Sequence, residues 1–206
     1  MDKTRIAVLV SGGGTNLQAL IDAQKSGVLK SGEIVLVISN NAIAYALTRA
    51  AEAGIPALTI TKKDCGGQEP FEDALIAALE ENRIDLIVLA GFMSILSERF
   101  TRRFERRIIN VHPSLIPSFC GKGFYGLKVH EAALAYGVKV TGATVHFVNE
   151  IPDGGRIILQ KAVSILPDDT PQSLQKRVME RAEWVILPEA AELVSSQIQK
   201  EKEYRQ

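Results

Sequence analysis

Short apolar runs alternate with helical patterns along the first half of the chain. The runs are rich in valine, isoleucine and leucine and have the length of strands that are buried on both faces. They occupy Ile6–Val10, Ile34–Ile38, Ala57–Ile60, Leu86–Ala90 and Ile108–Val111. Apolar residues at helical spacing lie between them, at Leu17, Leu20 and Ile21 before Gly27 and at Phe71, Leu75, Ala78 and Leu79 after Pro70. This alternation predicts parallel strands joined by right-handed crossover helices.

The pattern changes from Lys139 onward, where the segment VKVTGATVHFV alternates between apolar and polar residues. A DGG turn follows, and the segment IILQKAVSI then returns. This arrangement predicts extended strands added near one edge of the sheet. A short helix is expected over Glu131–Tyr136, with His130 at its start.

The last element is predicted to be a helix that begins at Thr170 and Pro171, an N-cap followed by proline at the first helical position. Pro188 is expected to kink or split this helix, and the charged residues from about Gln199 are expected to fray. The predicted fold is therefore α/β: a single domain over residues 1–206 with a mostly parallel, Rossmann-like sheet, helices on both faces and an antiparallel C-terminal strand portion.

Composition narrows the function classes. The 206 residues are 46% hydrophobic, which is enough for one continuous core. Lysine plus arginine and aspartate plus glutamate both total 24, so no net charge draws the whole molecule to nucleic acid or to a membrane. We find no leader-like or membrane-spanning run, and Cys65 and Cys120 lack the spacing of a zinc site or a disulfide framework. We expect a cytoplasmic protein without a metal.

A glycine-rich turn follows the first predicted strand. Ser11-Gly12-Gly13-Gly14-Thr15-Asn16 passes directly into a helix, which places backbone amides and the positive end of the helix dipole at the carboxyl end of a strand. Glycines allow an anion to approach the backbone, and Thr15 or Asn16 can add a side-chain donor. No lysine follows as in a nucleoside-triphosphate loop, so the turn predicts a monophosphate site. The alternative is a strand–helix turn that binds nothing.

An amide and an imidazole end the fifth predicted strand, in the segment INVHPSLIP. Alternation places Asn110 and His112 on the same side of that strand, and Pro113 and Pro117 stiffen the exit. The pair lies where open α/β sheets bind ligands, and it can polarise a carbonyl group. The structural alternative is a histidine at a strand end beside an asparagine that satisfies turn amides.

A carboxylate lies in the turn after the alternating segment, in Ile151-Pro152-Asp153-Gly154-Gly155. Turns favour aspartate for structural reasons. If the turn folds toward the fifth strand, Asp153 would keep His112 protonated near neutral pH and would also receive a proton. His146 is expected to pack or to orient its neighbours rather than to act as a second catalyst.

Four segments, SGGGTNLQAL, LIVLAGFMSIL, INVHPSLIPSF and TVHFVNEIPDGG, occur in an order that resembles phosphoribosylglycinamide formyltransferase, the folate-dependent transformylase family of purine synthesis. The terminal segment RVMERAEWVILPE also fits, and the resemblance covers nearly the whole chain. It implies transfer of a formyl group from the co-substrate 10-formyltetrahydrofolate to the amine of 5-phosphoribosylglycinamide, without a metal. The chain would be a monomer or a homodimer. The phosphate part would lie at about 1–100 and the folate and catalytic part at about 85–198.

The resemblance also implies a role for each matched residue. Asn110, His112 and Asp153 would be catalytic. Gly14, Thr15 and Asn16 would bind the substrate phosphate, and Glu183 would lie beside the glycinamide amine. The pterin pocket would be walled by Met93, Ser94, Ile95, Leu96, Asn110, Asn149, Glu150, Ile151, Pro152 and Asp153.

Two positions depart from the family pattern. Gln68 stands where many relatives carry a basic residue, which puts one folate contact in doubt. Cys120 stands in the loop CGKGFYGLKVHEAAL where a proline is frequent. We do not expect this cysteine to be a nucleophile, because no partner that lowers its pKa is identifiable and direct amine attack needs no covalent intermediate.

Three other functions stay open. A formyltetrahydrofolate hydrolase or a methionyl-tRNA formyltransferase could use a similar site, but each would be expected to carry an additional domain, regulatory or RNA-binding. A dinucleotide-binding module would be expected to have an acid near the end of the second strand, where this sequence has Ser39-Asn40-Asn41.

Overall fold

One twisted sheet organises the molecule. The computed structural model describes residues 2–204, and within them seven strands pair in the order β3-β2-β1-β4-β5-β6-β7. The strands are β1 Thr4–Val10, β2 Gly32–Ser39, β3 Ala57–Thr59, β4 Leu86–Leu89, β5 Ile108–His112, β6 Val140–Phe147 and β7 Ile157–Ser164. Strands β1 to β5 pair in parallel, and β6 and β7 pair antiparallel. The predicted α/β class with an antiparallel C-terminal portion is confirmed.

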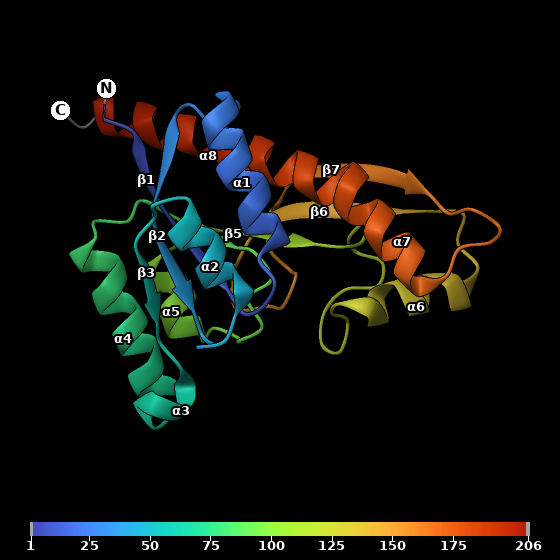
Figure 1. Ribbon diagram of the computed structural model, residues 1–206, viewed down its shortest axis with the longest axis horizontal. Helices are drawn as coiled ribbons and strands as arrows, with labels where there is room; N and C mark the ends of the chain where they lie inside the picture. The colour runs from blue at the N-terminus through green and yellow to red at the C-terminus, as the bar shows by residue number, and fades with distance from the viewer. Residues whose placement is uncertain (1, 205–206) are drawn as a thin grey trace.

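Helices cover both faces of the sheet. They are α1 Thr15–Ser26, α2 Tyr45–Glu52, α3 Lys62–Cys65, α4 Gln68–Glu81, α5 Glu98–Arg103, α6 Leu127–Tyr136, α7 Pro171–Val178 and α8 Trp184–Glu203, with a π-helical turn at Met179–Glu183 between the last two. Alternate residues of β1 divide the core between the two faces. Ile6 and Val8 pack with α1, α2 and α8, while Ala7 and Leu9 pack with α4 and α5. Figure 1 shows α1 beside α8, and the β6–β7 pair extending away with α6 and α7.

The strand order reverses direction between β1 and β4. The chain runs outward from β1 through β2 to β3, then returns to β4 on the other side of β1. The loops that follow β1 and β4 therefore diverge, and open α/β sheets bind ligands at such a point. The glycine turn at residues 11–16 follows β1, and the segment GFMSIL follows β4.

Two local expectations were wrong, and a third was wrong in part. Helix α6 begins at Leu127 rather than near Glu131, so His130 is a buried residue inside it. Helix α8 continues through Pro188, so the helix is not split there, and a π-helical turn precedes it. The same helix extends to Glu203, so the charged residues from Gln199 do not fray there; Arg205 and Gln206 lie outside the described residues.

Candidate active site

Asn110, His112 and Asp153 converge at the carboxyl end of β5. The Nδ1 atom of His112 lies 3.5 Å from Oδ2 of Asp153. His146, which pairs across the sheet with Asn110, completes the group. Its Nε2 atom lies 3.2 Å from Nδ2 of Asn110 and 3.6 Å from Oδ1 of Asp153. The predicted contact between the two distant segments is therefore present.

His146 orients the amide of Asn110. Its Nδ1 atom lies 2.8 Å from the carbonyl oxygen of Phe147, so the tautomer that satisfies both nitrogens donates from Nδ1 and accepts at Nε2 from Asn110. This arrangement fixes which end of the Asn110 amide carries the N–H groups. One of the two hydrogens on Nδ2 of Asn110 remains available for another partner. The orienting role expected for His146 agrees with this geometry.

His112 is held from both sides. Its Nε2 atom lies 2.9 Å from the carbonyl oxygen of Phe119, in the loop after β5, while Nδ1 faces Asp153. Burial lowers the pKa of His112, and the attraction of Asp153 and the Phe119 carbonyl only partly offsets it. The expectation that Asp153 keeps His112 charged at neutral pH is therefore wrong for the ligand-free protein, because the desolvation of a nearly buried ring outweighs one carboxylate. Sequence gave no signal for the Phe119 contact.

Asp153 projects from a tight turn. Its backbone has φ 56°, a left-handed conformation that aspartate tolerates better than most residues. The backbone amide of Gly121 donates to Oδ2 at 2.8 Å. Burial alone would raise the pKa of Asp153, but the neighbouring imidazoles of His146 and His112 and the Gly121 amide together bring that pKa below its ordinary value. Asp153 is therefore ionised at neutral pH.

A small cavity of about 130 Å³ opens beside this group. Its walls include most of the residues expected for the pterin pocket, and only His112 of the catalytic three and Met93 of the expected wall are missing from them. The lining residues are Leu89, Phe92, Ser94, Ile95, Leu96, Asn110, His146, Val148, Asn149, Glu150, Ile151, Pro152 and Asp153. The cavity is thus mainly apolar, with an amide, an imidazole and a carboxylate at one end.

The glycine turn, residues 11–16, has the geometry of an anion site. Gly14 has φ 71° and precedes the first residue of α1. Within the described part of the chain, the backbone amides of Gly13, Gly14, Thr15 and Asn16 make no hydrogen bond. They lie at a helix N-terminus, where free N–H groups and the helix dipole favour an anion.

Glu183 joins this turn from the C-terminal part of the chain. It is the last residue of the π-helical turn, and its Oε2 accepts a hydrogen bond of 2.8 Å from Nδ2 of Asn16. Burial raises the pKa of Glu183, and the hydrogen bond from Asn16 opposes this. The Oδ1 atom of Asn16 is buried and has no partner among the described residues. A free acceptor beside a carboxyl group is suited to an amine.

Two side chains, Ser11 after β1 and Asn40 after β2, bind the segment that follows β4. Oγ of Ser11 accepts from the backbone amide of Met93 at 2.8 Å, and Asn40 donates to Oγ of Ser94 at 2.7 Å. The ends of β1, β2 and β4 are thereby tied together, so the two halves of the site are held in a fixed relation.

The chain is similar to known proteins over most of its length. Residues 4–191 match the family model described as formyl transferase. The chain belongs to the formyl transferase family. It is 45% identical over 184 residues to phosphoribosylglycinamide formyltransferase of Haemophilus influenzae, which covers 89% of this chain and 84% of that protein.

Solved structures of relatives show the same fold. Glycinamide ribonucleotide transformylase 1 from Symbiobacterium toebii matches with a TM-score of 0.88 and 42% identity, over 95% of this chain and 89% of that one. The chain is also 47% identical over 194 residues to the human trifunctional purine biosynthetic protein adenosine-3. That match covers 94% of this chain but only 18% of the human protein, so this formyl transferase spans a small part of the trifunctional relatives.

The departures from the family pattern take defined places in this formyl transferase. Gln68 donates to Glu72 and to the carbonyl oxygen of Ile95, so it supports the cavity wall from behind. Cys120 donates to the Pro117 carbonyl, and burial, with a smaller contribution from Asp153, raises the pKa of its thiol. A thiol with a raised pKa is a poor nucleophile.

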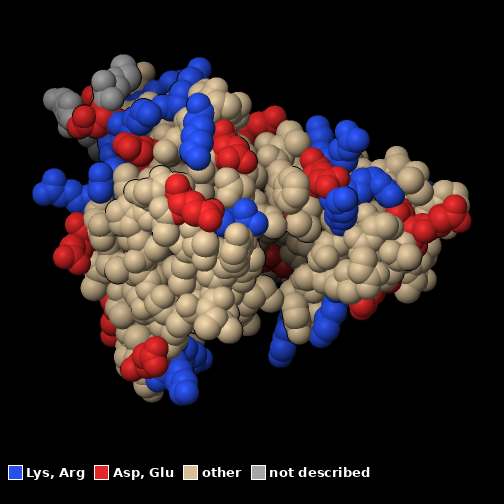
Figure 2. Space-filling view, viewed as in Figure 1, with Lys and Arg blue, Asp and Glu red and all other residues tan. Residues whose placement is uncertain are grey.

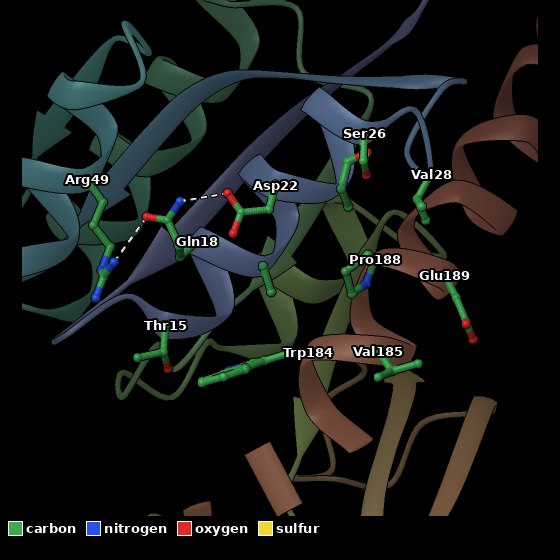
Figure 3. Close-up of a pocket in the computed structure, with 12 residues that line it drawn as sticks. Thr15, Gln18, Asp22, Ser26, Val28, Arg49, Trp184, Val185, Pro188 and Glu189 are labelled. Atoms are coloured by element: carbon green, nitrogen blue, oxygen red, sulfur yellow. Dashed lines mark hydrogen bonds between the residues drawn. The ribbon is translucent and has the colours of Figure 1, made fainter. Parts of the chain in front are cut away.

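A separate cavity of about 560 Å³ lies between α1, α2 and α8. Figure 3 shows Thr15, Gln18 and Arg49 at one end of it and Val28 and Glu189 at the other. It borders the glycine turn through Thr15, and it contains none of the catalytic candidates at the end of β5.

Among residues 2–204, no group of three or more histidine, cysteine, aspartate or glutamate side chains is arranged to hold a metal ion. No helix in that part of the chain has both the length and the apolar character needed to cross a membrane.

Proposed function

We propose that the protein transfers the formyl group of 10-formyltetrahydrofolate to the amine of 5-phosphoribosylglycinamide, a step of purine synthesis. The observation that supports this most strongly is the group Asn110, His112 and Asp153 at one end of a small apolar cavity. An anion-binding turn, joined through Ser11 to the backbone of Met93 beside that cavity, gives the phosphate of the acceptor a place. Formyl transfer needs both a folate site and an acceptor site.

The acceptor is held at two ends. Its phosphate binds the free amides of the glycine turn, at Gly14, Thr15 and Asn16. Its amine lies at Oδ1 of Asn16, the buried acceptor without a partner, and beside Glu183. With a raised pKa, Glu183 can take a proton from the ammonium form of the substrate, which leaves a nitrogen with a free electron pair.

The nitrogen attacks the formyl carbon, and negative charge develops on the formyl oxygen. Asn110 donates its remaining N–H to this oxygen, because His146 holds the amide in the required orientation. His112 donates from Nδ1 after taking up a proton from solvent, and it returns that proton to solvent once the formyl oxygen has lost its negative charge. Protonation of His112 is favoured by the carboxylate of Asp153 and by the negative charge that develops on the formyl oxygen. His112 therefore changes from mainly neutral to charged during the step.

Asp153 completes the proton balance. The attacking nitrogen must lose a proton once its bond to carbon has formed, and the folate nitrogen must gain one as its bond to carbon breaks. The carboxylate of Asp153 lies at the cavity end and can relay that proton, directly or through water. It returns to its ionised form after each cycle.

The cavity fits the flat ring of the co-substrate. Leu89, Phe92, Leu96 and Val148 supply apolar contacts, and the backbone of the Asn149–Asp153 loop supplies hydrogen-bonding groups at its edge. Bound there, 10-formyltetrahydrofolate supplies the activated formyl group. The Asn149–Asp153 loop, Ser94, Ile95 and Leu96 would hold it, and Met93, which is half exposed, would cover the opening.

The direct test is to incubate the purified protein with 10-formyltetrahydrofolate and, separately, with 5-phosphoribosylglycinamide, with its unphosphorylated form, and without acceptor. We expect formylation of the phosphorylated acceptor at a rate far above the other two. Equal loss of the formyl group without acceptor would favour the hydrolase instead.

The remaining expectations belong to this proposal. We propose a phosphate part at about 1–100 and a folate and catalytic part at about 85–198. A reducing cytoplasmic location suits the two free cysteines, Cys65 and Cys120. The chain would act as a monomer or a homodimer, without metal or nucleic acid.

A further inference from the structure

Two carbonyl groups of the glycine turn, those of Gly12 and Gly13, accept hydrogen bonds from helix α2. The backbone amide of Ala46 donates to the Gly12 carbonyl at 3.0 Å. Nε of Arg49, one helical turn later, donates to the Gly13 carbonyl at 2.8 Å. In a trans peptide the carbonyl and the following N–H point in opposite directions. Fixing the Gly13 oxygen toward α2 therefore fixes the Gly14 N–H toward the other side, where an anion would lie.

The Arg49 side chain is itself held in place. Its Nη1 donates to Oε1 of Gln18 at 3.0 Å, and Gln18 donates onward to Asp22 at 2.9 Å. Its guanidinium carbon lies 5.0 Å from the centre of the Tyr45 ring. Figure 3 shows the hydrogen bonds from Arg49 to Gln18 and from Gln18 to Asp22, with Thr15 below them. These contacts already order the Arg49 side chain, so binding the Gly13 carbonyl costs little additional side-chain entropy.

We infer that Arg49 is a positioning residue for the phosphate site: it orients the Gly14 amide by binding the Gly13 carbonyl, and its charge strengthens the attraction for a phosphate monoester. This inference rests on the proposed function, because it requires that the turn binds the acceptor phosphate. Arg49 does not act on the reacting atoms. It should therefore govern the affinity for the phosphorylated acceptor and leave the chemical step unchanged.

The test compares Arg49→Met with a matched control, Arg5→Met. Arg5 also donates from Nε to a backbone carbonyl, that of Asn82, at 2.8 Å, but at the opposite end of β1. Calorimetry would give dissociation constants for 5-phosphoribosylglycinamide and for its unphosphorylated form, and steady-state kinetics would give KM and kcat. For Arg49→Met we expect about tenfold weaker binding of the phosphorylated ligand, less than about twofold change for the unphosphorylated one, and unchanged kcat. Arg5→Met should match the wild type in all of these.

Two further variants separate the contributions. Arg49→Lys keeps the charge but cannot bind Gly13 and Gln18 with a planar fork, so it should recover only part of the affinity. Gln18→Met leaves Arg49 in place but removes its support, so it should weaken phosphate binding less than Arg49→Met does. If Arg49→Met does not fold, this second variant decides the question.

Three results would overturn the inference. One is an unchanged affinity of Arg49→Met, or of Gln18→Met where the first does not fold, for the phosphorylated ligand. Another is an equal loss for both ligands, which would mean general damage to the fold. The third is a wild-type protein that binds the two ligands equally well, which would remove the proposed phosphate site itself and is distinguishable because it needs no variant.

Discussion

His112 lies between two oxygen atoms, the carbonyl of Phe119 and the carboxylate of Asp153, in a nearly buried position. The surroundings suit a charged ring, yet burial lowers its pKa. Such a residue gains its proton most readily when negative charge appears beside it. The same residue can therefore be neutral at rest and a charged donor in the transition state.

Replacing His112 by alanine should lower kcat at least about a hundredfold, because a preorganised donor is worth roughly 2.7–4 kcal/mol in a transition state. Binding of 5-phosphoribosylglycinamide should remain close to that of the wild type, since the glycine turn is formed by other residues. Turnover measured with saturating substrates checks this. Wild-type turnover in the variant would remove His112 from the mechanism.

Gly14 and Gly12 give a matched pair in the glycine turn. Sequence suggested that a side chain at Gly14 would block the approach of an anion, but a Cβ there would lie 2.6 Å from Cβ of Ala46, on the side of α2, and the φ of 71° is also unfavourable. Gly14→Val should therefore lower the stability by at least about 1 kcal/mol and raise the substrate dissociation constant by displacing the turn.

Gly12 is the control for this effect. A Cβ at Gly12 meets nothing within 4 Å, and its φ is ordinary. Gly12→Val should leave the urea midpoint unchanged. A stable Gly14→Val protein with normal affinity would show that the turn does not depend on this close contact.

Helix α7 shows an element whose start follows from local sequence. Thr170 accepts from the Ser173 amide, and Ser173 accepts from the Thr170 amide, so two free donors at the helix start are satisfied. This agrees with the cap expected at Thr170 and Pro171. The π-helical turn that follows has no such local signal, and its last residue, Glu183, makes its hydrogen bond to Asn16, which is distant in the sequence.

Thr170→Ala should destabilise the protein by about 1 kcal/mol, the usual cost of a lost N-cap. Thr170→Ser keeps the hydroxyl and should be close to neutral. Chemical denaturation of both variants gives the comparison. Equal stability of the two would mean that the cap contributes nothing here.

Strands β1, β2, β4 and β5 were predictable because each lies in a short apolar run, and β6 was predictable from its alternation of apolar and polar residues. The α6 start and the Phe119 contact were not predictable, because they depend on tertiary packing. Local pattern located Asn110, His112 and Asp153, and their convergence required only that the turn fold back along β6. The charge of His112 could not be predicted, since burial is a property of the whole fold.

At the level of the whole molecule, buried histidines should make stability depend on pH. Burial, with the nearby His112, lowers the pKa of His130 from 6.5 to about 4. Between these values the unfolded chain binds a proton at His130 that the folded chain does not, so acid favours unfolding. His130 alone should cost about 3 kcal/mol on going from pH 7.5 to pH 4.

Denaturation of wild type and His130→Gln at both pH values isolates this contribution. The wild type should lose more stability than the variant over that interval, by about 3 kcal/mol. The ionisation of carboxylates is common to both proteins and cancels in the difference. Equal losses of stability in the two proteins would show that groups other than His130 cause the pH dependence.

Figure 2 shows acidic and basic side chains interspersed on the face seen, without a large area of one sign. The equal totals of 24 acidic and 24 basic residues agree with this distribution. Recognition of an anionic substrate must then be local, in the turn and the groups around it. The positions of both ligands relative to Asn110, His112 and Asp153 therefore test the proposed chemistry most directly.

A crystal structure with 5-phosphoribosylglycinamide and an unreactive analogue of 10-formyltetrahydrofolate measures these positions. We predict the phosphate on the amides of Gly14, Thr15 and Asn16, and the oxygen that replaces the formyl oxygen within hydrogen-bonding distance of Asn110 Nδ2 and His112 Nδ1. A folate bound away from Asn110 and His112, for example in the cavity between α1 and α8, would contradict the proposed chemistry.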